Sequence, residues 1–348
     1  MSSMHTLTLT PPARTSVSTR IVIGDGIREG IAEFLPPSEK IVLLFDLSVS
    51  TIADSVASAI PGCVKIGVKS GDASKSLAEA DRIVTAMLNA GCARRSVIVA
   101  VGGGMLTDLA GFVASVFMRG VPCVLVPTTL LGMVDAAIGG KTAVNAGDRK
   151  NMIGTVTHPY AVVIDTSLLQ SLPDPQIREG LSEMVKIAAI ADAPYFTWLE
   201  EHADQFLKRD AVVLSEGVVR AVSAKKAIVE RDEHDRDVRL LLNFGHTVGH
   251  AVEAKSGYTI PHGSAVSIGM VIEMALAGVK DAPRIKALLE QIGLPVSLPK
   301  DMALPELWIA MQSDKKNEGG EVKIAVPSRL GEGAVQTVLE EKFLSLTA

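Results

Sequence analysis

The sequence predicts an α/β fold with a doubly wound parallel sheet in its first half and mostly helices in its second half. In the first half, short apolar runs alternate with segments of helical periodicity, which is typical of parallel strands joined by crossover helices. After about Ser167, long helical patterns take over. The length of 348 residues suits two domains, because single cores rarely grow beyond about 250–300 residues.

Five short apolar runs in the first half are predicted to be buried strands. One helix between them has apolar residues at helical spacing and stops at Gly91, a residue suited to end a helix. The predicted strands are residues 41–46, 64–68, 97–101, 121–126 and 161–164, and the predicted helices are residues 76–90 and 107–119.

The second half has a different pattern of apolar residues, with long stretches of helical periodicity. Only one strand is expected in it, at residues 322–326. The predicted helices are residues 178–191, 211–233, 247–254, 263–280 and 283–292. The change from alternating strand and helix patterns to helical patterns alone places a domain boundary near residues 166–175, around the sequence Leu172-Pro173-Asp174-Pro175.

Composition excludes several classes of protein. Lys and Arg number 34 against 39 Asp and Glu, so the formal charge of −5 argues against a nucleic-acid partner held by bulk charge. Aromatic residues make up only 4%, too few for a stacking surface for single strands. The sequence has no uncharged apolar run of the roughly 18 residues that a membrane span needs.

The cysteines and the amino-terminal segment bear on the compartment. Three widely separated cysteines, Cys63, Cys92 and Cys123, favour neither a disulfide framework nor a CxxC metal site. Residues 1–20 contain no apolar stretch of the kind found in secretory signals. We therefore expect a cytoplasmic protein, where thiols stay reduced.

A glycine turn follows the strand at residues 97–101 and precedes a helix. Backbone amides of Gly102, Gly103 and Gly104 at such a helix start could hold a diphosphate. The full GxGxxG pattern is absent, so a tight turn without a ligand is an equally good interpretation. Asp46 ends an earlier strand and could accept ribose hydroxyls, or it could be an ordinary cap.

Two further patterns suggest ligand binding. Lys141 and Lys150 lie in a Gly-rich stretch suited to anions, although a solvated surface loop is the commoner explanation for a lysine. His246 and His250 have the i, i+4 spacing that can bind zinc, and His262 follows nearby. Thr247 stands where the HExxH glutamate of metalloproteases would be, so protease chemistry is disfavoured. Spacing alone does not choose a third ligand, and polar contacts near a helix start remain an alternative for the histidines.

Taken together, a series of motifs resembles the 3-dehydroquinate synthases, within the wider sugar phosphate cyclases. The resemblance runs from about residue 41 to residue 316, which is most of the chain. In order, the motifs are residues 102–112 (GGGMLTDLAGF), Arg119-Gly120, residues 127–131 (PTTLL), Asp135 with residues 139–141 (GGK), residues 150–154 (KNMIG), Glu183 with Lys186, residues 242–253 (LNFGHTVGHAVE), His262-Gly263 and Asp314-Lys315-Lys316.

The resemblance implies both a fold and a reaction. Residues 1–168 would form a Rossmann-like NAD-binding domain, and residues 169–348 a mostly α-helical domain that binds metal and substrate. The reaction would convert 3-deoxy-arabino-heptulosonate 7-phosphate to 3-dehydroquinate and phosphate through oxidation, phosphate elimination, reduction and aldol closure. It would need NAD and Zn²⁺ or Co²⁺. The partners would be a small phosphorylated sugar acid and a second copy of the chain, with no nucleic acid and no membrane.

The same resemblance assigns roles to individual residues. The implied metal ligands are Glu183, His246 and His262. The implied catalytic residues are Asp135, Lys186 and Lys225 around the sugar hydroxyls, and Lys141, Asn243 and His250 at the phosphate end, His250 also as a proton-transfer residue. The implied substrate contacts are Lys315 or Lys316 and, from the second subunit, Arg119 at the phosphate, with Lys150, Asn151 and Arg239 at the carboxylate. The implied NAD contacts are Asp46, Asp72, Lys75, Gly103, Gly104, Met105, Asp108, Thr128, Thr129, Lys141, Lys150 and Thr166.

Departures from the family pattern leave related activities open. Ser182 replaces a usual Ala before the implied metal ligand Glu183, Asp235 replaces a usual Glu, and Thr107 and Pro175 also depart from the pattern. None of these changes removes an implied site residue. The alternatives are an aminodehydroquinate synthase, a valiolone-type synthase and, more distantly, a metal-dependent polyol dehydrogenase. Retention of Arg239, Asn243 and the Asp314-Lys315-Lys316 segment favours an acid substrate.

Overall fold

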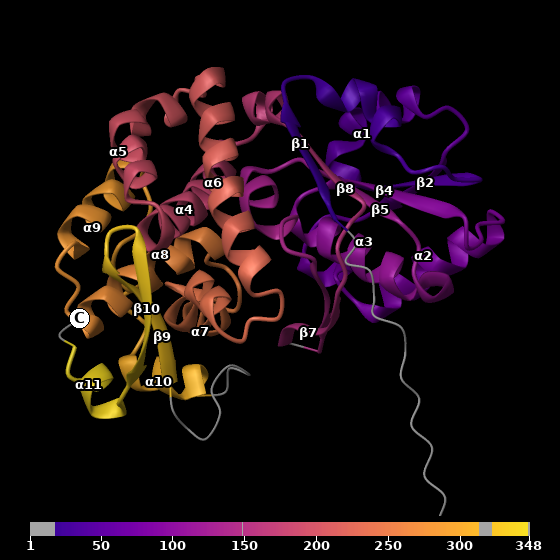
Figure 1. Ribbon diagram of the computed structural model, residues 1–348. Helices are drawn as coiled ribbons and strands as arrows, with labels where there is room; N and C mark the ends of the chain where they lie inside the picture. The colour runs from indigo at the N-terminus through magenta and orange to yellow at the C-terminus, as the bar shows by residue number, and fades with distance from the viewer. Residues whose placement is uncertain (1–17, 148, 313–321, 347–348) are drawn as a thin grey trace, which may run out of the picture.

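The computed structural model describes residues 18–147, 149–312 and 322–346. Its first half contains a six-stranded sheet in which every neighbouring pair is parallel, in the order β1-β8-β5-β4-β2-β3 (Figure 1). The strands are β1 (Arg20–Gly24), β2 (Lys40–Asp46), β3 (Val64–Val68), β4 (Ser96–Gly102), β5 (Cys123–Pro127) and β8 (Ala161–Asp165). The predicted parallel sheet is confirmed, and the half-exposed edge strand β1 is added to the five predicted strands.

Side chains of the central strands point alternately into two apolar cores. In β2, Val42 and Leu44 belong to one core, whereas Leu43 and Phe45 belong to the other. Helix α1 (Ser50–Ala59) covers one face of the sheet, and α2 (Leu77–Asn89) and α3 (Gly104–Val116) cover the other. Because both faces are buried, the strands read as continuous apolar runs, and sequence analysis could find them.

A β-hairpin that the sequence did not predict projects from this half toward the helical half. It consists of β6 (Lys141–Ala146) and β7 (Arg149–Val156), which pair antiparallel. Asn145 attaches the hairpin to the loop before α2, because its backbone N–H donates to Lys75 O at 2.8 Å and its side chain donates to Asp72 O at 3.2 Å. Lys141, Lys150 and Asn151 therefore lie on ordered strands and not in the loop expected from composition.

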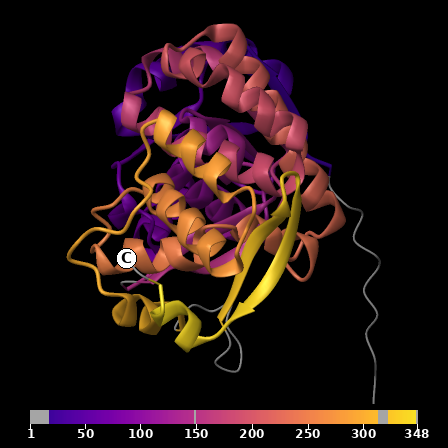
Figure 2. The same cartoon turned by 90° about the vertical axis from the view of Figure 1, so that its left-hand side faces the viewer.

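The second half is mostly helical, as predicted (Figure 2). Helix α4 (Asp174–Ala191) lies at its centre, and its residues from Gly180 to Ile190 are all buried, the charged Glu183 and Lys186 included. The helices at residues 193–207, 304–312 and 340–344 and the strand at residues 332–338 were not predicted from the sequence. The helices are α4 (Asp174–Ala191), α5 (Ala193–Leu207), α6 (Ala211–Arg231), α7 (His246–Lys255), α8 (His262–Ala277), α9 (Ala282–Gln291), α10 (Leu304–Gln312) and α11 (Glu340–Leu344), and β9 (Val322–Arg329) pairs with β10 (Glu332–Val338).

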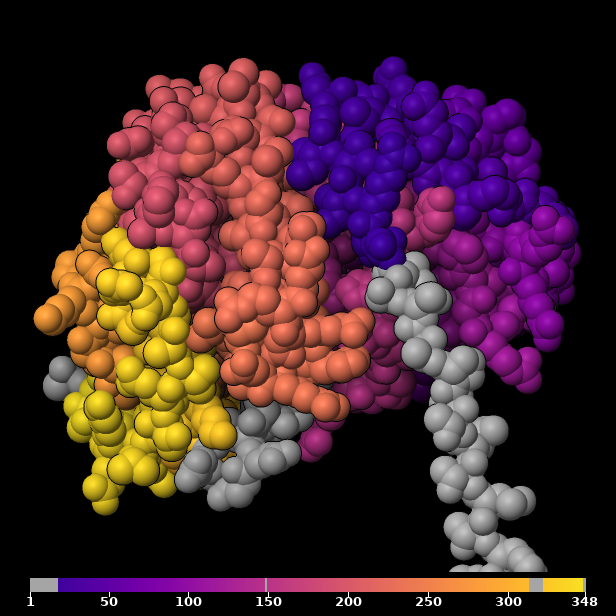
Figure 3. All heavy atoms as spheres, viewed as in Figure 1, coloured from indigo at the N-terminus to yellow at the C-terminus, as the bar shows by residue number. Residues whose placement is uncertain are grey.

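The two halves meet along a recess beside α6 (Figure 3). A 3-10 helix at Thr166–Ser171 follows the last strand of the sheet and leads into α4. The division at residues 168 and 169 stays a prediction. Among the described residues, every helix is too short or too polar to cross a bilayer.

Candidate metal and substrate site

Three helices bring together a carboxylate and two imidazoles. Glu183 lies in the middle of α4, and His246 and His262 are the first residues of α7 and α8. Oε1 of Glu183 is 3.7 Å from Nε2 of His246 and 3.3 Å from Nε2 of His262. A tetrahedral ion with metal–ligand distances of about 2.0–2.2 Å separates its ligand atoms by about 3.3–3.6 Å. The spacing of these three atoms therefore suits one shared divalent cation.

The burial of the Glu183 carboxylate and its lack of ordinary hydrogen bonds among the described residues agree with a cation site. In the described part of the chain, neither of its buried oxygens takes part in a hydrogen bond of ordinary geometry. Lys186, one helical turn further along, forms an ion pair with Oε2, while Oε1 faces the two imidazoles. A buried carboxylate is costly unless positive charge compensates it. The residues present thus fit a metal ion bound by one carboxylate and two imidazoles.

Carboxylates surround the His262 imidazole on two sides. Burial opposes a charge on this ring, but Glu183 and Glu253 outweigh burial and raise the pKa of His262 to about 10. Burial would raise the pKa of Glu253, but the hydrogen bond with His262 and the charges of His262 and Lys150 lower it to about 2. The cluster therefore favours a positive charge between its carboxylates, which is the charge that a bound cation supplies.

Two carboxylates that sequence analysis missed cap the helices that carry the histidines. Glu273 of α8 accepts hydrogen bonds from Gly245 N at 2.7 Å and Val248 N at 3.0 Å, at the start of α7. Gly245 has a φ of 78°, and a Cβ there would lie 2.6 Å from the Val266 carbonyl oxygen, so only glycine fits this approach. These bonds satisfy backbone donors that a helix start leaves free.

The start of α8 is held in a similar way from α4. Glu179 accepts hydrogen bonds from the backbone N–H of Gly263 and, at 3.1 Å, from that of Ser264. Ser182, which departs from the usual family residue, donates to the Gly263 carbonyl at 2.7 Å. The capping residues are far from the histidines in sequence, so no local capping signal could reveal them.

A second cluster of charges lies beside Glu183. Lys225 Nζ of α6 donates to Oδ1 of Asp135 at 2.6 Å, and Lys186 Nζ lies 3.7 Å from the same oxygen. Burial would raise the pKa of Asp135, but the two ammonium groups hold it below its usual range. Burial and the Lys186 charge lower the pKa of Lys225. Buried, oriented charges of both signs next to a cation site suit the hydroxyl groups of a sugar.

The glycine turn lies at the carboxyl end of the sheet. Strand β4 ends at Gly102 and α3 begins at Gly104, three residues before the predicted helix start at Thr107. Among the described residues, no side chain caps α3, so its first amides, including that of Met105, are available to an anion. Lys75 Nζ donates to Asp108 Oδ2 at 2.6 Å, close to this turn. Parallel sheets bind dinucleotides at such edges.

The other implied NAD contacts are spread along this edge of the sheet. Asp46 caps a short 3-10 helix, and its Oδ1 accepts hydrogen bonds from Ser48, so the ordinary-cap interpretation is at least part of its role. Thr128 is buried directly after β5, and the Thr129 hydroxyl accepts a hydrogen bond from Gly132 N at 3.1 Å. Thr166 is buried after β8, and its hydroxyl donates to Gly24 O at 3.3 Å.

Several implied substrate residues come from the hairpin and from the segment before α7. Lys141 forms an ion pair with Asp235, the residue that departs from the family Glu. The buried Arg239 donates to Glu233 O at 2.6 Å and to Gly139 O at 2.9 Å. Lys75 also donates to the Asn151 side chain. Asn243 is half-buried three residues before His246, and the His250 ring lies 5.3 Å from the His246 ring, centroid to centroid.

Two sets of implied residues lie elsewhere. Arg119 is not in α3, which ends at Val116, but is the last residue of the 3-10 helix Phe117–Arg119 that follows it, with a left-handed φ of 68°. It stands at the opposite end of α3 from Gly104, and 13 helical residues at 1.5 Å each separate the ends by about 20 Å. Arg119 therefore lies far from the glycine turn of its own chain. Lys315 and Lys316 lie outside the described residues.

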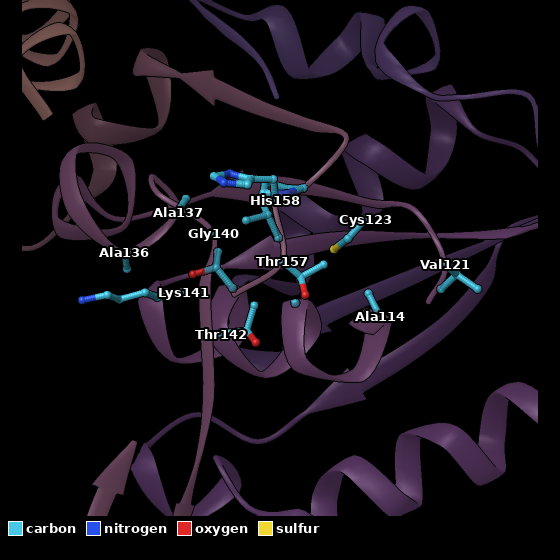
Figure 4. A pocket seen from close by; sticks show the side chains of 14 residues that line it. Ala114, Val121, Cys123, Ala136, Ala137, Gly140, Lys141, Thr142, Thr157 and His158 are labelled. Atoms are coloured by element: carbon cyan, nitrogen blue, oxygen red, sulfur yellow. The ribbon is translucent and has the colours of Figure 1, made fainter. Parts of the chain in front are cut away.

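A small cavity of about 20 Å³ lies behind Lys141 and is separate from the carboxylate and imidazole cluster. Its walls come from α3, β5 and the segments around Gly140 and His158, and Lys141 extends away from the other side chains (Figure 4). This volume holds about one water molecule. The cavity is too small for a sugar phosphate.

Comparison with known proteins covers both halves of the chain. The family model described as 3-dehydroquinate synthase N-terminal matches residues 65–179, and the one described as C-terminal matches residues 180–317. A 3-dehydroquinate synthase from Pseudoalteromonas atlantica is 36% identical over 323 residues, covering 90% of this chain and 91% of the relative. One from Dictyoglomus thermophilum is 40% identical over 282 residues, covering 80% and 79%.

Solved structures of sugar phosphate cyclases share the fold. A 2-epi-5-epi-valiolone synthase from Streptomyces hygroscopicus, with NAD⁺ and Zn²⁺ bound, is 26% identical with a TM-score of 0.88 over 96% of this chain and 97% of that chain. A 2-deoxy-scyllo-inosose synthase complexed with carbaglucose-6-phosphate, NAD⁺ and Co²⁺ is 24% identical, with a TM-score of 0.86 over 93% and 94%, and shows the fold alone. The predicted Rossmann-like and helical architecture is thus confirmed. Because the sequence matches span most of both halves, the chain belongs to the 3-dehydroquinate synthase family.

Proposed function

We propose that the protein converts 3-deoxy-arabino-heptulosonate 7-phosphate to 3-dehydroquinate and phosphate, as an NAD- and metal-dependent carbon–oxygen lyase. The observation that carries this proposal is the convergence of Glu183, His246 and His262 beside the ion-paired cluster of Asp135, Lys186 and Lys225. A cation site next to oriented charges suits the oxidation and reduction of a sugar carbinol. Membership of the family supplies the substrate.

The bound groups would each supply one kind of chemistry: NAD would accept and return a hydride, and Zn²⁺ or Co²⁺ would act as a Lewis acid at the oxidised oxygen. Glu183, His246 and His262 would hold the metal. Met105 and the adjacent amides at the start of α3 would bind the dinucleotide diphosphate. Lys75 and Asp108 would lie beside it. Side chains around the substrate would bind it, orient its hydroxyl groups and transfer protons.

We assign the remaining residues by position and charge. Asp135, Lys186 and Lys225 would orient the hydroxyl groups, and His250, beside His246, would transfer a proton at the phosphate end. Lys141 and Asn243 would contact the phosphate, and Lys150, Asn151 and Arg239 the carboxylate. Since Arg239 already donates to two backbone carbonyls, we expect it to act partly by holding the Gly139 turn. Gly139 has a φ of 106°, and a Cβ there would lie 2.6 Å from the Arg239 guanidinium, so the turn and the arginine are matched.

We also propose a homodimer in the cytoplasm. Arg119 is exposed on the turn after α3, where it can serve a second copy. The neighbouring apolar side chains Val116 and Met118 are 47% and 36% exposed, as expected for a surface that pairs with another subunit. The three cysteines form no disulfide, which agrees with a reducing compartment.

The principal alternative is a related cyclase of secondary metabolism. The similarity to the valiolone synthase over nearly the whole chain is the reason to retain this alternative function. A valiolone-type substrate has no carboxylate, whereas this chain has Arg239 and Asn151, which we assign to a substrate carboxylate. An aminodehydroquinate synthase would use the same residues. Glycerol dehydrogenase from Schizosaccharomyces pombe shares the fold at 18% identity and a TM-score of 0.66, which makes a polyol dehydrogenase the more distant alternative.

Product analysis separates these activities. The purified protein with NAD and Zn²⁺ or Co²⁺ should release phosphate from the heptulosonate phosphate with no net NADH, and NMR should identify 3-dehydroquinate. A parallel reaction with sedoheptulose 7-phosphate tests the valiolone-type activity. Turnover of the second substrate alone would contradict the proposal. Stoichiometric NADH from a simple polyol would point to a dehydrogenase.

A further inference from the structure

Glu253 of α7 lies between a predicted metal ligand and a lysine from the other half of the chain. Its Oε2 is 3.2 Å from Nδ1 of His262. Its Oε1 is 3.3 Å from Nζ of Lys150 on β7. The side chain is only 5% exposed, so both contacts occur away from bulk water. The family resemblance gave Glu253 no role, although it lies on the same face of α7 as His246 and His250.

The two nitrogens of His262 face two different carboxylates. Nε2 lies 3.3 Å from Glu183 Oε1, on the side of the proposed metal, and Nδ1 lies 3.2 Å from Glu253. A metal-bound imidazole usually donates its other N–H to a carboxylate or carbonyl, which fixes the tautomer and the ring orientation. His246 has the equivalent contact, because its Nδ1 is 3.2 Å from the Phe244 carbonyl oxygen. Both histidines therefore have an acceptor behind the ring.

Glu253 could instead be a ligand, because His250, Glu253 and His262 form a second compact group of potential ligand atoms. The position of Lys150 argues against this. Its ammonium group is paired with Glu253 and also lies 2.7 Å from Asp72 Oδ2 and 4.3 Å from the centre of the Tyr258 ring. A second divalent ion at Glu253 would be repelled by this ammonium at close range.

We propose that Glu253 is a positioning residue of the metal site, which accepts a hydrogen bond from Nδ1 of His262 and directs Nε2 toward the metal, while Lys150 holds Glu253 in place. This inference rests on the metal site proposed above. Because Lys150 belongs to the hairpin and also contacts Asp72, the orientation of a metal ligand in the helical half depends on a strand of the sheet half.

Cobalt binding tests the inference. E253A and E253Q are prepared as metal-free proteins, and Co²⁺ affinity is measured by competition with a chelator, together with the visible Co²⁺ spectrum. E253A should bind Co²⁺ about 10–100-fold more weakly and show an altered spectrum. E253Q should lose less affinity, because its amide oxygen still accepts from Nδ1–H. The matched control is E306Q, since the exposed Glu306 pairs with Lys255 of α7 at 3.5 Å, and it should match the wild type.

Each other outcome is informative. Unchanged affinity and spectrum in folded E253A, or a lower thermal midpoint alone, would overturn the positioning role. Loss of a second equivalent of Co²⁺ would make Glu253 a ligand instead. If E253A does not fold, an E253Q protein with wild-type affinity and spectrum overturns the inference. A wild-type protein that binds no Co²⁺ would instead remove the metal site and the proposed function with it.

Discussion

His262 illustrates what sequence could and could not supply at the scale of one residue. The i, i+4 spacing draws attention to His246 and His250, whereas the family resemblance selects His246 and His262. The structure places Nε2 of both selected rings next to Glu183 Oε1. Spacing could not make this choice, because Glu183 reaches the site from another helix. The resemblance includes Glu253 at the end of a motif but gives it no role, because that role depends on a contact with the next helix.

Removing the His262 ring should empty the metal site without unfolding the protein. H262A should lose most bound Zn²⁺, as measured by elemental analysis after gel filtration, because one of three ligands is gone. Far-UV circular dichroism should remain that of the wild type, since α8 keeps its Glu179 cap. H234A, which removes an exposed histidine, should retain the metal. Full metal content in H262A would contradict the ligand assignment.

Asp165 at the end of β8 should make stability depend on pH. Burial would raise its pKa, but hydrogen bonds from Ser167, Arg28 and the Gly26 amide lower it. A group with a lowered pKa contributes stability that is complete above its ordinary pKa of about 3.9 and is lost as the pH falls through the folded-state value. D165N should therefore cost about 1–3 kcal/mol at neutral pH and progressively less in acid.

The measurement is urea unfolding of the metal-free protein at about pH 7 and about pH 3, on either side of the ordinary carboxylate pKa. D54N is the control, because Asp54 forms only an exposed ion pair with Lys65 and should change little at either pH. An equal loss of stability for D165N at both pH values would show that the charge of Asp165 is not responsible.

At the scale of elements, predictability depended on burial. Strands such as β4, buried at all seven positions, stood out as apolar runs. The β6–β7 hairpin did not, because β7 exposes most of its residues and contains Gly154. Gly154 is required for packing, since a Cβ there would lie 2.0 Å from the Thr142 carbonyl oxygen. Glycine and lysine therefore made a paired strand look like a loop.

The carboxylate caps from neighbouring helices should matter for the metal as well as for folding. E273Q replaces an acceptor oxygen with an N–H₂ group that cannot accept from Gly245 or Val248, so one bond at the start of α7 is lost. We expect a loss of about 1–3 kcal/mol in stability and weaker Zn²⁺ binding through His246. Thermal unfolding and chelator competition measure the two effects. E290Q, which alters an exposed glutamate on α9, should show neither. A stable E273Q protein with unchanged Zn²⁺ affinity would contradict this role.

At the scale of the whole molecule, the sequence predicted two halves and a composite site. The structure confirms the sheet half and the helical half, and it places the implied metal and sugar-hydroxyl residues together. Arg119 is not among them, since it lies beyond the end of α3 that is opposite the glycine turn. The resemblance assigns Arg119 to the phosphate site of a second subunit, so the proposed dimer would place it at the partner's site.

Mixing two inactive variants tests this shared site. R119A damages the site of the partner, and K186A damages the site of its own chain. In a randomly mixed dimer population, half of the dimers combine both variants, and each of these has one intact site, so about a quarter of wild-type activity should return. Subunits are exchanged by co-expression with two tags, and phosphate release is measured. R94A, at another exposed arginine, should be active alone. No recovery in the mixture, or an active R119A protein, would contradict the shared site.

The separation of the proposed metal ligands along the chain implies an order of assembly. Glu183 precedes His246 by 63 residues, and the Glu273 cap on α7 comes later still. All strands of the parallel sheet have been synthesised by Asp165, before any ligand has left the ribosome. A metal held by these residues would therefore require α4, α7 and α8 to have been synthesised and packed together. During biosynthesis, ion capture would follow synthesis of the sheet strands and would report the packing of these three helices.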